Sequence, residues 1–249
     1  MNITIKCKDS DYKYSLKLQN IIIILMVFLS YGKLFAEDYR IYLLGIPIVN
    51  VSMESSSNTL SFHAETFSLI HSLWPVNNHY FTKYDSISFG ILQYTKSIHQ
   101  GNYKGKLNCI YNADSSQLSY NGQSISTVDS IQNIFTLLSR VSYQSVEYLD
   151  TKWLPVNHEG TPHRARFLWV GAKLVEIDDV SILCDHYRLD IEETDGAVIH
   201  ISPYDYFTDH VASSDALRQL WVEQGGNRRI IKATVSIYGM TITAEIQYQ

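Results

Sequence analysis

The stretch IIKATVSIYGMTITAEIQYQ, residues 230–249, decides the fold class. Apolar residues hold every second position on both sides of Gly239, with polar residues between most of them. The apolar set is Ile231, Ala233, Val235 and Ile237 before the glycine, and Met240, Ile242, Ala244, Ile246 and Tyr248 after it. Successive side chains of a β-strand point to opposite faces, so this pattern predicts two strands that each have one apolar face. The glycine between them predicts a tight antiparallel turn.

The residues before this stretch extend the antiparallel pattern. A second turn is predicted at Gly225-Gly226-Asn227, and the segment 219–223 before it is rich in apolar residues. We therefore expect three consecutive strands to close the chain. Their predicted ranges are 219–223, 229–238 and 240–247.

The two-residue period recurs through the rest of the chain. It is found in residues 39–44, 49–54, 60–65, 107–112 and 186–191. These segments predict a mainly β (α+β) fold, in which a curved antiparallel sheet forms an open barrel or a sandwich.

One helix is predicted within this β pattern, and a second is weaker. Ile131, Ile134, Phe135, Leu138 and Val141 recur at the spacing of one helical face. The first helix is predicted over residues 129–140, with Asp129 or Thr127 capping its amino end. The second is predicted to start near Ser213 and run into Leu217. Helices of this kind cover the apolar side of a sheet, so we expect one or two packed helices.

The amino-terminal residues have the layout of a secretory signal peptide. Lysines are spread through the segment that ends at Lys17, an apolar run covers residues 21–29, and small or apolar residues lead to Ala36. This order of a basic region, an apolar region and a small residue is typical of signal peptides. We predict a signal peptide over residues 1–36, with cleavage between Ala36 and Glu37.

A retained membrane anchor is the alternative for this apolar run. A bilayer span needs about 20 apolar residues, and Ser30, Gly32 and Lys33 interrupt the run here. Cleavage is therefore favoured, and the product is predicted to be a single exported domain, residues 37–249, in the periplasm or cell envelope. No linker-like segment divides that range.

Charge and motif content exclude several classes of partner. The chain has a net charge of −5, and residues 1–36 carry five Lys against two Asp, which leaves −8 on residues 37–249. An acidic surface repels phosphate backbones, so nucleic acid is not expected as a partner. The sequence has no phosphate-binding Gly-x-x-x-x-Gly-Lys loop and no Gly-x-Gly-x-x-Gly motif, so no nucleotide or dinucleotide is expected either.

Two cysteines, Cys109 and Cys184, remain after the predicted cleavage. In an oxidising compartment such a pair can form a disulfide, and we treat the two as candidates for one. The alternative is that both act as small buried apolar residues.

A dispersed hydrolase site is the catalytic alternative. His158 and His163 flank a helix-breaking Pro162, so they lack the His-Glu-x-x-His spacing that places two imidazoles on one helical face. They could still form a loop metal site with a distant carboxylate. Asp185 and His186 complete the set of catalytic candidates. Because no cluster has an accepted ligand spacing, we expect no metal and no cofactor.

The chain resembles an exported bacterial family known as domain of unknown function 3108. The resemblance lies in the order of four short segments. They are Tyr42-Leu43-Leu44-Gly45-Ile46-Pro47, Asp129 leading into the helix 131–140, the strands of residues 167–177, and Leu220-Trp221-Val222 followed by Arg228-Arg229 and the Gly239 turn. One departure is that Ile230-Ile231 stands where a proline is expected after the Arg pair. The resemblance implies an exported, β-rich domain and brings no reaction or catalytic residue.

These observations favour a non-catalytic binding domain of the cell envelope. Residues 39–44 and 167–170 are apolar on both faces, which a sheet with one solvated face does not require. We therefore expect the inner side of the sheet to form an apolar cavity for a lipid-like or other hydrophobic ligand, or to hold an envelope partner protein. The alternatives are the hydrolase with its dispersed site and a structural envelope protein that binds no small molecule.

Overall fold

The structure of the protein is a computed structural model that describes residues 35–201 and 205–248. The predicted signal peptide lies outside these residues, except for its last two positions, Phe35 and Ala36. None of the helices in the described residues is long and apolar enough to cross a membrane.

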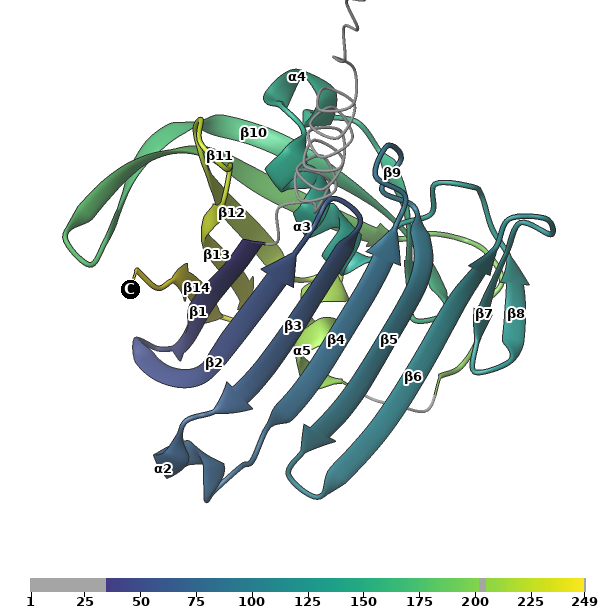
Figure 1. Ribbon diagram of the computed structural model, residues 1–249, viewed down its shortest axis with the longest axis horizontal. Helices are drawn as coiled ribbons and strands as arrows, with labels where there is room; N and C mark the ends of the chain where they lie inside the picture. The colour runs from purple at the N-terminus through teal and green to yellow at the C-terminus, as the bar shows by residue number, and fades with distance from the viewer. Residues whose placement is uncertain (1–34, 202–204, 249) are drawn as a thin grey trace, which may run out of the picture. The chain divides into compact units, whose positions relative to one another are not determined.

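Antiparallel strands make up most of the described chain (Figure 1). Its fourteen strands are β1 (Phe35–Leu43), β2 (Ile46–Ser55), β3 (Thr59–Thr66), β4 (Asn77–Tyr84), β5 (Ile91–Gln100), β6 (Tyr103–Asn112), β7 (Gln117–Tyr120), β8 (Gln123–Ser126), β9 (Leu154–His158), β10 (Thr161–Ile177), β11 (Val180–Glu193), β12 (Leu217–Glu223), β13 (Ile230–Ile237) and β14 (Met240–Ile246). The helices of the same residues are α2 (Ser68–His71), α3 (Ile134–Tyr143), α4 (Val146–Leu149) and α5 (Tyr206–Ala212). The predicted mainly β fold, with an antiparallel sheet and few helices, is confirmed.

All fourteen strands belong to one sheet, in which two antiparallel meanders meet. The order is β8-β7-β6-β5-β4-β3-β2-β1-β14-β13-β12-β11-β10-β9. The first strand, β1, pairs with the last strand, β14, so the two ends of the described chain lie in the middle of the sheet. Strands β8 and β9 end the order and do not pair with each other, so the sheet is open. The three strands predicted at the carboxyl end are β12, β13 and β14.

The turn between β13 and β14 confirms the tight antiparallel turn that the sequence predicts at Gly239. Tyr238 and Gly239 have φ angles of 49° and 81°, and Ile237 pairs with Met240 across them. Two consecutive residues with positive φ are the mark of a type I′ turn, whose twist suits a two-residue hairpin. Gly239 therefore sets the register in which the apolar rows of β13 and β14 share one face.

The segment 131–133 runs between the two meanders as extended chain. The backbone N–H of Ile91, in β5, donates to the carbonyl oxygen of Ile131 at 2.8 Å. On the other side, Gln132 N donates to Pro155 O at 3.0 Å, and Asn157 N donates to Gln132 O at 2.8 Å. The segment thus joins β5 to the edge strand β9 and delivers the chain to α3.

This bridge corrects the predicted start of the first helix. The helix does not begin at Asp129, because residues 131 and 132 use their backbone groups to bind neighbouring strands. Instead, the Asn133 side chain accepts from Thr136 N at 2.8 Å, and the Thr136 hydroxyl accepts from Asn133 N at 3.1 Å. This reciprocal pair is a capping box, which satisfies two of the free donors at a helix start.

The second predicted helix is wrong in position. The helix of this region is α5, which ends at Ala212, and Leu217 already begins β12. Asp205 starts α5 by accepting from Phe207 N at 3.1 Å. The segment from Ser213 onward is not helical, because the chain there turns to pair β12 with β11 and β13.

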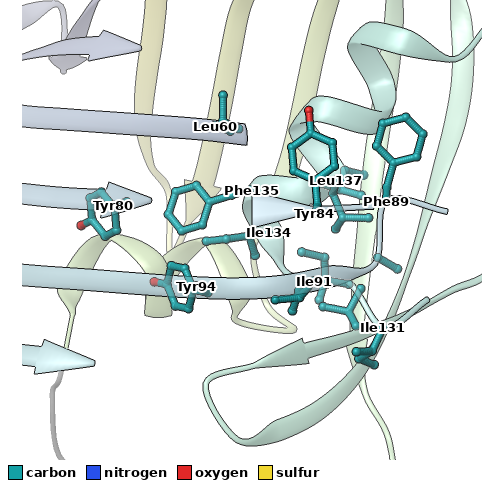
Figure 2. Packing of buried hydrophobic residues seen from close by; sticks show 14 of the residues in the cluster. Leu60, Tyr80, Tyr84, Phe89, Ile91, Tyr94, Ile131, Ile134, Phe135 and Leu137 are labelled. Atoms are coloured by element: carbon teal, nitrogen blue, oxygen red, sulfur yellow. The ribbon is translucent and has the colours of Figure 1, made fainter. Parts of the chain in front are cut away.

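Helix α3 packs on the inner face of the sheet, which we define as the face that carries α3 and α5. Figure 2 shows the Phe135 side chain beside Tyr80 and Tyr94 of neighbouring strands. The ring centroid of Phe135 lies 5.1 Å from that of Tyr80, 5.6 Å from that of Tyr94 and 5.3 Å from that of Phe62. Aromatic pairs at these distances add to the stability that burial gives. The core thus forms around the predicted apolar stripe of this helix.

Candidate functional site

An apolar cavity of about 260 Å³ lies between the inner face of the sheet and the helices α3 and α5. Its walls come from β1 to β4, from β11 to β14 and from both helices. Ala233 of β13 and Ala244 of β14, which are opposite each other in register, both line it. Most of the lining is aliphatic or aromatic, with a few polar side chains. Ligand pockets typically have this composition, so the cavity is the candidate binding site.

Helix α5 supplies one wall of the cavity, through Tyr206, Phe207 and Val211 among others. Its cap residue Asp205 is fully buried. The Asp205 carboxylate also accepts hydrogen bonds from the Tyr80 hydroxyl at 2.9 Å and from Gln100 Nε2 at 3.0 Å. These bonds attach the amino end of α5 to β4 and β5, so the sheet positions this wall of the cavity.

Lys96 is a buried cation that joins this attachment to the turn between β9 and β10. Its Nζ lies 2.5 Å from Glu159 Oε2 and 3.9 Å from Asp205 Oδ2, and the Tyr94 hydroxyl donates to Glu159 Oε1 at 3.2 Å. Burial and the nearby Glu159 carboxylate hold the pKa of Tyr94 far above its usual value. A neutral tyrosine and a paired lysine are poor candidates for proton transfer, so this network has a structural role.

Arg218 of β12 lies at the opposite end of α5. Its guanidinium donates to the carbonyl oxygens of Val211 and Ser213, and to that of Ala216 at 2.9 Å. The backbone carbonyls at the end of a helix carry partial negative charge and lack partners within the helix. Arg218 therefore caps the carboxyl end of α5 while it also lines the cavity.

The fold places His158 beside a carboxylate that is distant in the sequence. The alternative of a loop metal site requires such a contact. His158 Nε2 lies 3.2 Å from Asp209 Oδ1 of α5. Together with Glu159, these residues place one ligand atom each within 4.8 Å of one another, which is close enough to hold a metal ion. Glu159 is already paired with Lys96, however, and a cation beside a ligand carboxylate weakens metal binding. The expectation that no metal is needed stays a prediction.

The structure divides the four catalytic candidates into two pairs. His163 lies near His158, with 6.1 Å between ring centroids. Asp185 pairs with Ala172 in register, nine positions along β10 from His163, which is about 30 Å of strand. Asp185 and His186 also point to opposite faces, because they are neighbours in β11. No site contains all four residues.

Asp185 and His186 have structural contacts of their own. The Asp185 carboxylate accepts from Gln224 Nε2 at 2.7 Å and from an amino group of Arg228 at 3.2 Å. Arg228 in turn donates to the carbonyl oxygen of Gln144, at the end of α3, at 3.1 Å. The His186 ring stacks on Trp221 with 4.5 Å between centroids. These contacts anchor α3 and pack the sheet.

The structure has Cys109 and Cys184 as free, buried thiols. Cys109 lies in the apolar cluster around α3, and Cys184 lies in a second cluster with Val175 and Trp221. The pair is therefore not bridged in this structure. Burial raises the pKa of Cys109 to about 12 and that of Cys184 to about 11, so neither thiol is an active nucleophile at neutral pH.

The predicted cleavage site lies at the start of β1. Ala36 pairs with Glu54, and Glu37 pairs with Met53. Cleavage between Ala36 and Glu37 would remove two residues from the end of this strand and leave its pairing with β14, which starts at Tyr39. The cleavage site remains a prediction.

No protein-family model matches the chain, and no curated protein matches it either. The likeness to domain of unknown function 3108 is therefore not confirmed.

Solved structures do resemble the chain. It is similar to the β-barrel-like protein of domain of unknown function DUF1849 from Brucella abortus, with a TM-score of 0.54 and 7% identity over 86% of this chain and 96% of that chain. This likeness shows a shared fold. The hypothetical lipoprotein YmcC from Escherichia coli K12 matches with a TM-score of 0.32 and 8% identity, over 99% of this chain and 98% of that one. The lipoprotein LppX from Mycobacterium tuberculosis matches with a TM-score of 0.24 and 10% identity, over 85% of each chain.

The residues that position α5, which are Lys96, Asp205 and Arg218, were not predicted from the sequence. The sequence pattern could have indicated Arg218. It lies two positions before Leu220 in β12, so both face inward, where a charged residue is unusual. Lys96 likewise has buried apolar residues, Tyr94 and Ile98, two positions to either side. Asp205 carried no such signal, because its partners are 105 and 125 residues away in the sequence.

Proposed function

We propose that the protein is an exported, non-catalytic binding domain that holds a hydrophobic ligand in the cavity between the sheet, α3 and α5. The observation that carries this proposal is the cavity itself, whose lining is largely apolar. Several lining side chains, among them Leu138, Val211 and Ala233, remain partly exposed. Apolar surface that the protein does not cover is available to a ligand, and its burial would favour binding at about 25 cal/mol per Å².

Export is the second part of the proposal, and it rests on the signal-peptide layout of residues 1–36. We also propose that the protein works in the periplasm or cell envelope. The same proposal includes membership of the family known as domain of unknown function 3108. Sequencing the amino terminus of the protein recovered from the exported fraction tests export. We expect a first residue near Glu37, and a protein that still starts at Met1 would contradict export with cleavage.

Ligand binding is tested by extracting the purified protein with organic solvent for mass spectrometry and by titrating it with the neutral fluorescent probe N-phenyl-1-naphthylamine. We expect a co-purifying apolar compound, or saturable binding of the probe with one site per chain. A protein that yields no lipid and does not bind the probe would favour the structural envelope protein instead.

The hydrolase alternative is favoured by the contact between His158 and Asp209, which together with Glu159 also form the possible metal site. A carboxylate that orients a histidine is part of many catalytic sites, but the histidine then needs a nucleophile at its other nitrogen. Here the carboxylate contacts Nε2, and the Asp209 side chain belongs to the helix that forms the cavity wall. This contact serves the position of α5, so the binding function is better supported.

A further inference from the structure

The lining of the cavity is asymmetric in charge. Two basic residues, Arg218 and His210, contribute to it, and none of the described residues that line it is an aspartate or a glutamate. His210 Nδ1 donates to the carbonyl oxygen of Tyr206 at 2.6 Å, which leaves the Nε2 atom as the remaining polar atom of the ring. Arg218 thus places a positive charge in the wall of the cavity in addition to its bonds at the end of α5.

Arg218 is the stronger of these two features, because only 3% of its surface is exposed. Its partners are backbone carbonyl oxygens, including that of Leu189 at 3.4 Å, and no carboxylate of the described residues forms an ion pair with it. Burial lowers its pKa to about 10, so the guanidinium remains charged at neutral pH. The carbonyl dipoles satisfy hydrogen bonds but do not cancel the full charge.

Asp190 is the acidic residue that attracts Arg218, and other basic groups already neutralise its charge. Asp190 acts on Arg218 only through a longer-range attraction. Its carboxylate is paired with Arg166 at 3.0 Å and with Arg188 at 2.8 Å. A buried charge without a counter-ion is costly, so an anion that enters the cavity would gain a strong electrostatic interaction there.

We propose that the cavity binds a single-chain amphiphile with an anionic head, of the long-chain carboxylate class, whose head lies toward Arg218. This inference rests on the proposed ligand-binding function and names the chemical class of the ligand. The chain of the ligand would lie along the small and aliphatic residues of β13, β14 and β1, such as Ala233, Ala244 and Ile41. A volume of about 260 Å³ lies just below the usual range of pockets, about 300 to 1,000 Å³, which favours one chain over several.

The test compares three ligands with the same fourteen-carbon chain on the unaltered protein: myristate, its neutral methyl ester and tetradecylammonium. Each is titrated against bound N-phenyl-1-naphthylamine, and displacement is read as loss of fluorescence. Because a hydrogen bond to a charged group is stronger than one between neutral groups, we expect myristate to displace the probe at a concentration about ten-fold or more below that of the ester. The ammonium compound should be weakest.

The outcomes separate the two proposals. If the ester competes as well as myristate, the anionic head is wrong while apolar binding stands. If the probe does not bind and no ligand protects the protein against thermal unfolding, the binding function fails and this inference fails with it. Equal competition by the ammonium compound would also overturn the role of Arg218.

Variants then assign the preference to one side chain. In Arg218→Gln, the ester and myristate should displace the probe at about the same concentration, with the affinity of the probe measured separately for each variant. Arg218→Lys should retain part of the preference for myristate. Arg164→Gln is the matched control, because Arg164 is exposed on β10, does not line the cavity and pairs with Glu192. If Arg218→Gln does not fold for lack of its cap on α5, the ligand series on the unaltered protein still decides the question. An unchanged preference for myristate in a folded Arg218→Gln protein would refute the proposal.

Discussion

The inner face of the sheet has two neighbouring regions that differ in how well they are filled. Around α3, the rings of Phe62, Tyr80 and Tyr94 surround Phe135 with 5.1 to 5.6 Å between centroids. Beside it, under α5, the strands β13 and β14 present an alanine pair and short aliphatic side chains, and a cavity of about 260 Å³ remains. Phe62, Tyr80 and Phe135 line that cavity as well, so their rings form the boundary between the two regions.

The difference shows that side-chain volume, and not the strand pattern, decides where this protein is solid and where it is hollow. Both regions have the same alternation of inward and outward residues. In the filled region large rings span the distance from sheet to helix, as close packing requires. In the other region Ala233 and Ala244 line a cavity beside α5, which is held in place from its two ends by Asp205 and Arg218.

The largest effect should come from emptying the filled region. Phe135→Ala is expected to lower the free energy of unfolding by about 3 to 5 kcal/mol, because the lost ring leaves a cavity among Phe62, Tyr80 and Tyr94. Urea denaturation measures this change. Phe81→Ala is the control, since Phe81 occupies an outward, partly exposed position of β4, and it should cost clearly less. A loss below about 1 kcal/mol for Phe135→Ala would mean that the two regions do not differ in packing.

Filling the hollow region is the converse experiment. Ala233→Phe should weaken binding of N-phenyl-1-naphthylamine at least ten-fold, about 1.4 kcal/mol, because the new ring occupies the cavity. The free energy of unfolding should change by less than the 1 to 3 kcal/mol that is typical of inserting bulk into a packed core. Ala172→Phe, at an exposed position of β10 that does not line the cavity, should leave binding intact. Unchanged binding in Ala233→Phe would place the probe elsewhere.

A smaller effect is expected at the start of α3, which carries Phe135 into the filled region. Asn133→Ala removes the side-chain acceptor of the capping box and should lower the free energy of unfolding by about 1 kcal/mol. Thermal denaturation of this variant, beside Asp129→Ala, separates the observed cap from the predicted one. Asp129→Ala should have the lesser effect, and the reverse order would argue for a helix that starts earlier.

The smallest effect is expected from metal removal. Since Glu159 is paired with Lys96, the contacts between His158, Glu159 and Asp209 should hold α5 over the cavity without a metal. Treatment with a chelator should leave both the unfolding temperature and probe binding unchanged. Stoichiometric zinc in protein purified without added metal, lost in His158→Ala, would contradict this and strengthen the hydrolase alternative.

Local pattern was enough to predict most of the strands. The alternation on either side of Gly239 predicted β13 and β14 within a residue or two of their ends, because the two-residue period is a property of each strand by itself. The apolar stripe of α3 was also correct from Ile134 onward, whereas the predicted start of the helix was wrong. Ile131 fits the helical spacing but lies in the extended bridge, and hydrogen bonds to β5 and β9 outweigh its place in the stripe.

By itself, the sequence determined the fold class, the inward-facing rows and the presence of surplus apolar surface on the sheet, since each follows from residue type and spacing along the chain. Only the tertiary structure decided which part of this surface lines a cavity, because that depends on where α5 is held. Tyr39 and Ile41 of β1 line it, whereas none of residues 167–170 does. Asp205 reaches partners in β4 and β5 that are more than 100 residues away. The tertiary structure likewise separated His158 from Asp185 and placed Arg218 without a carboxylate partner. Such contacts depend on which strands become neighbours, and no local period in the sequence encodes that.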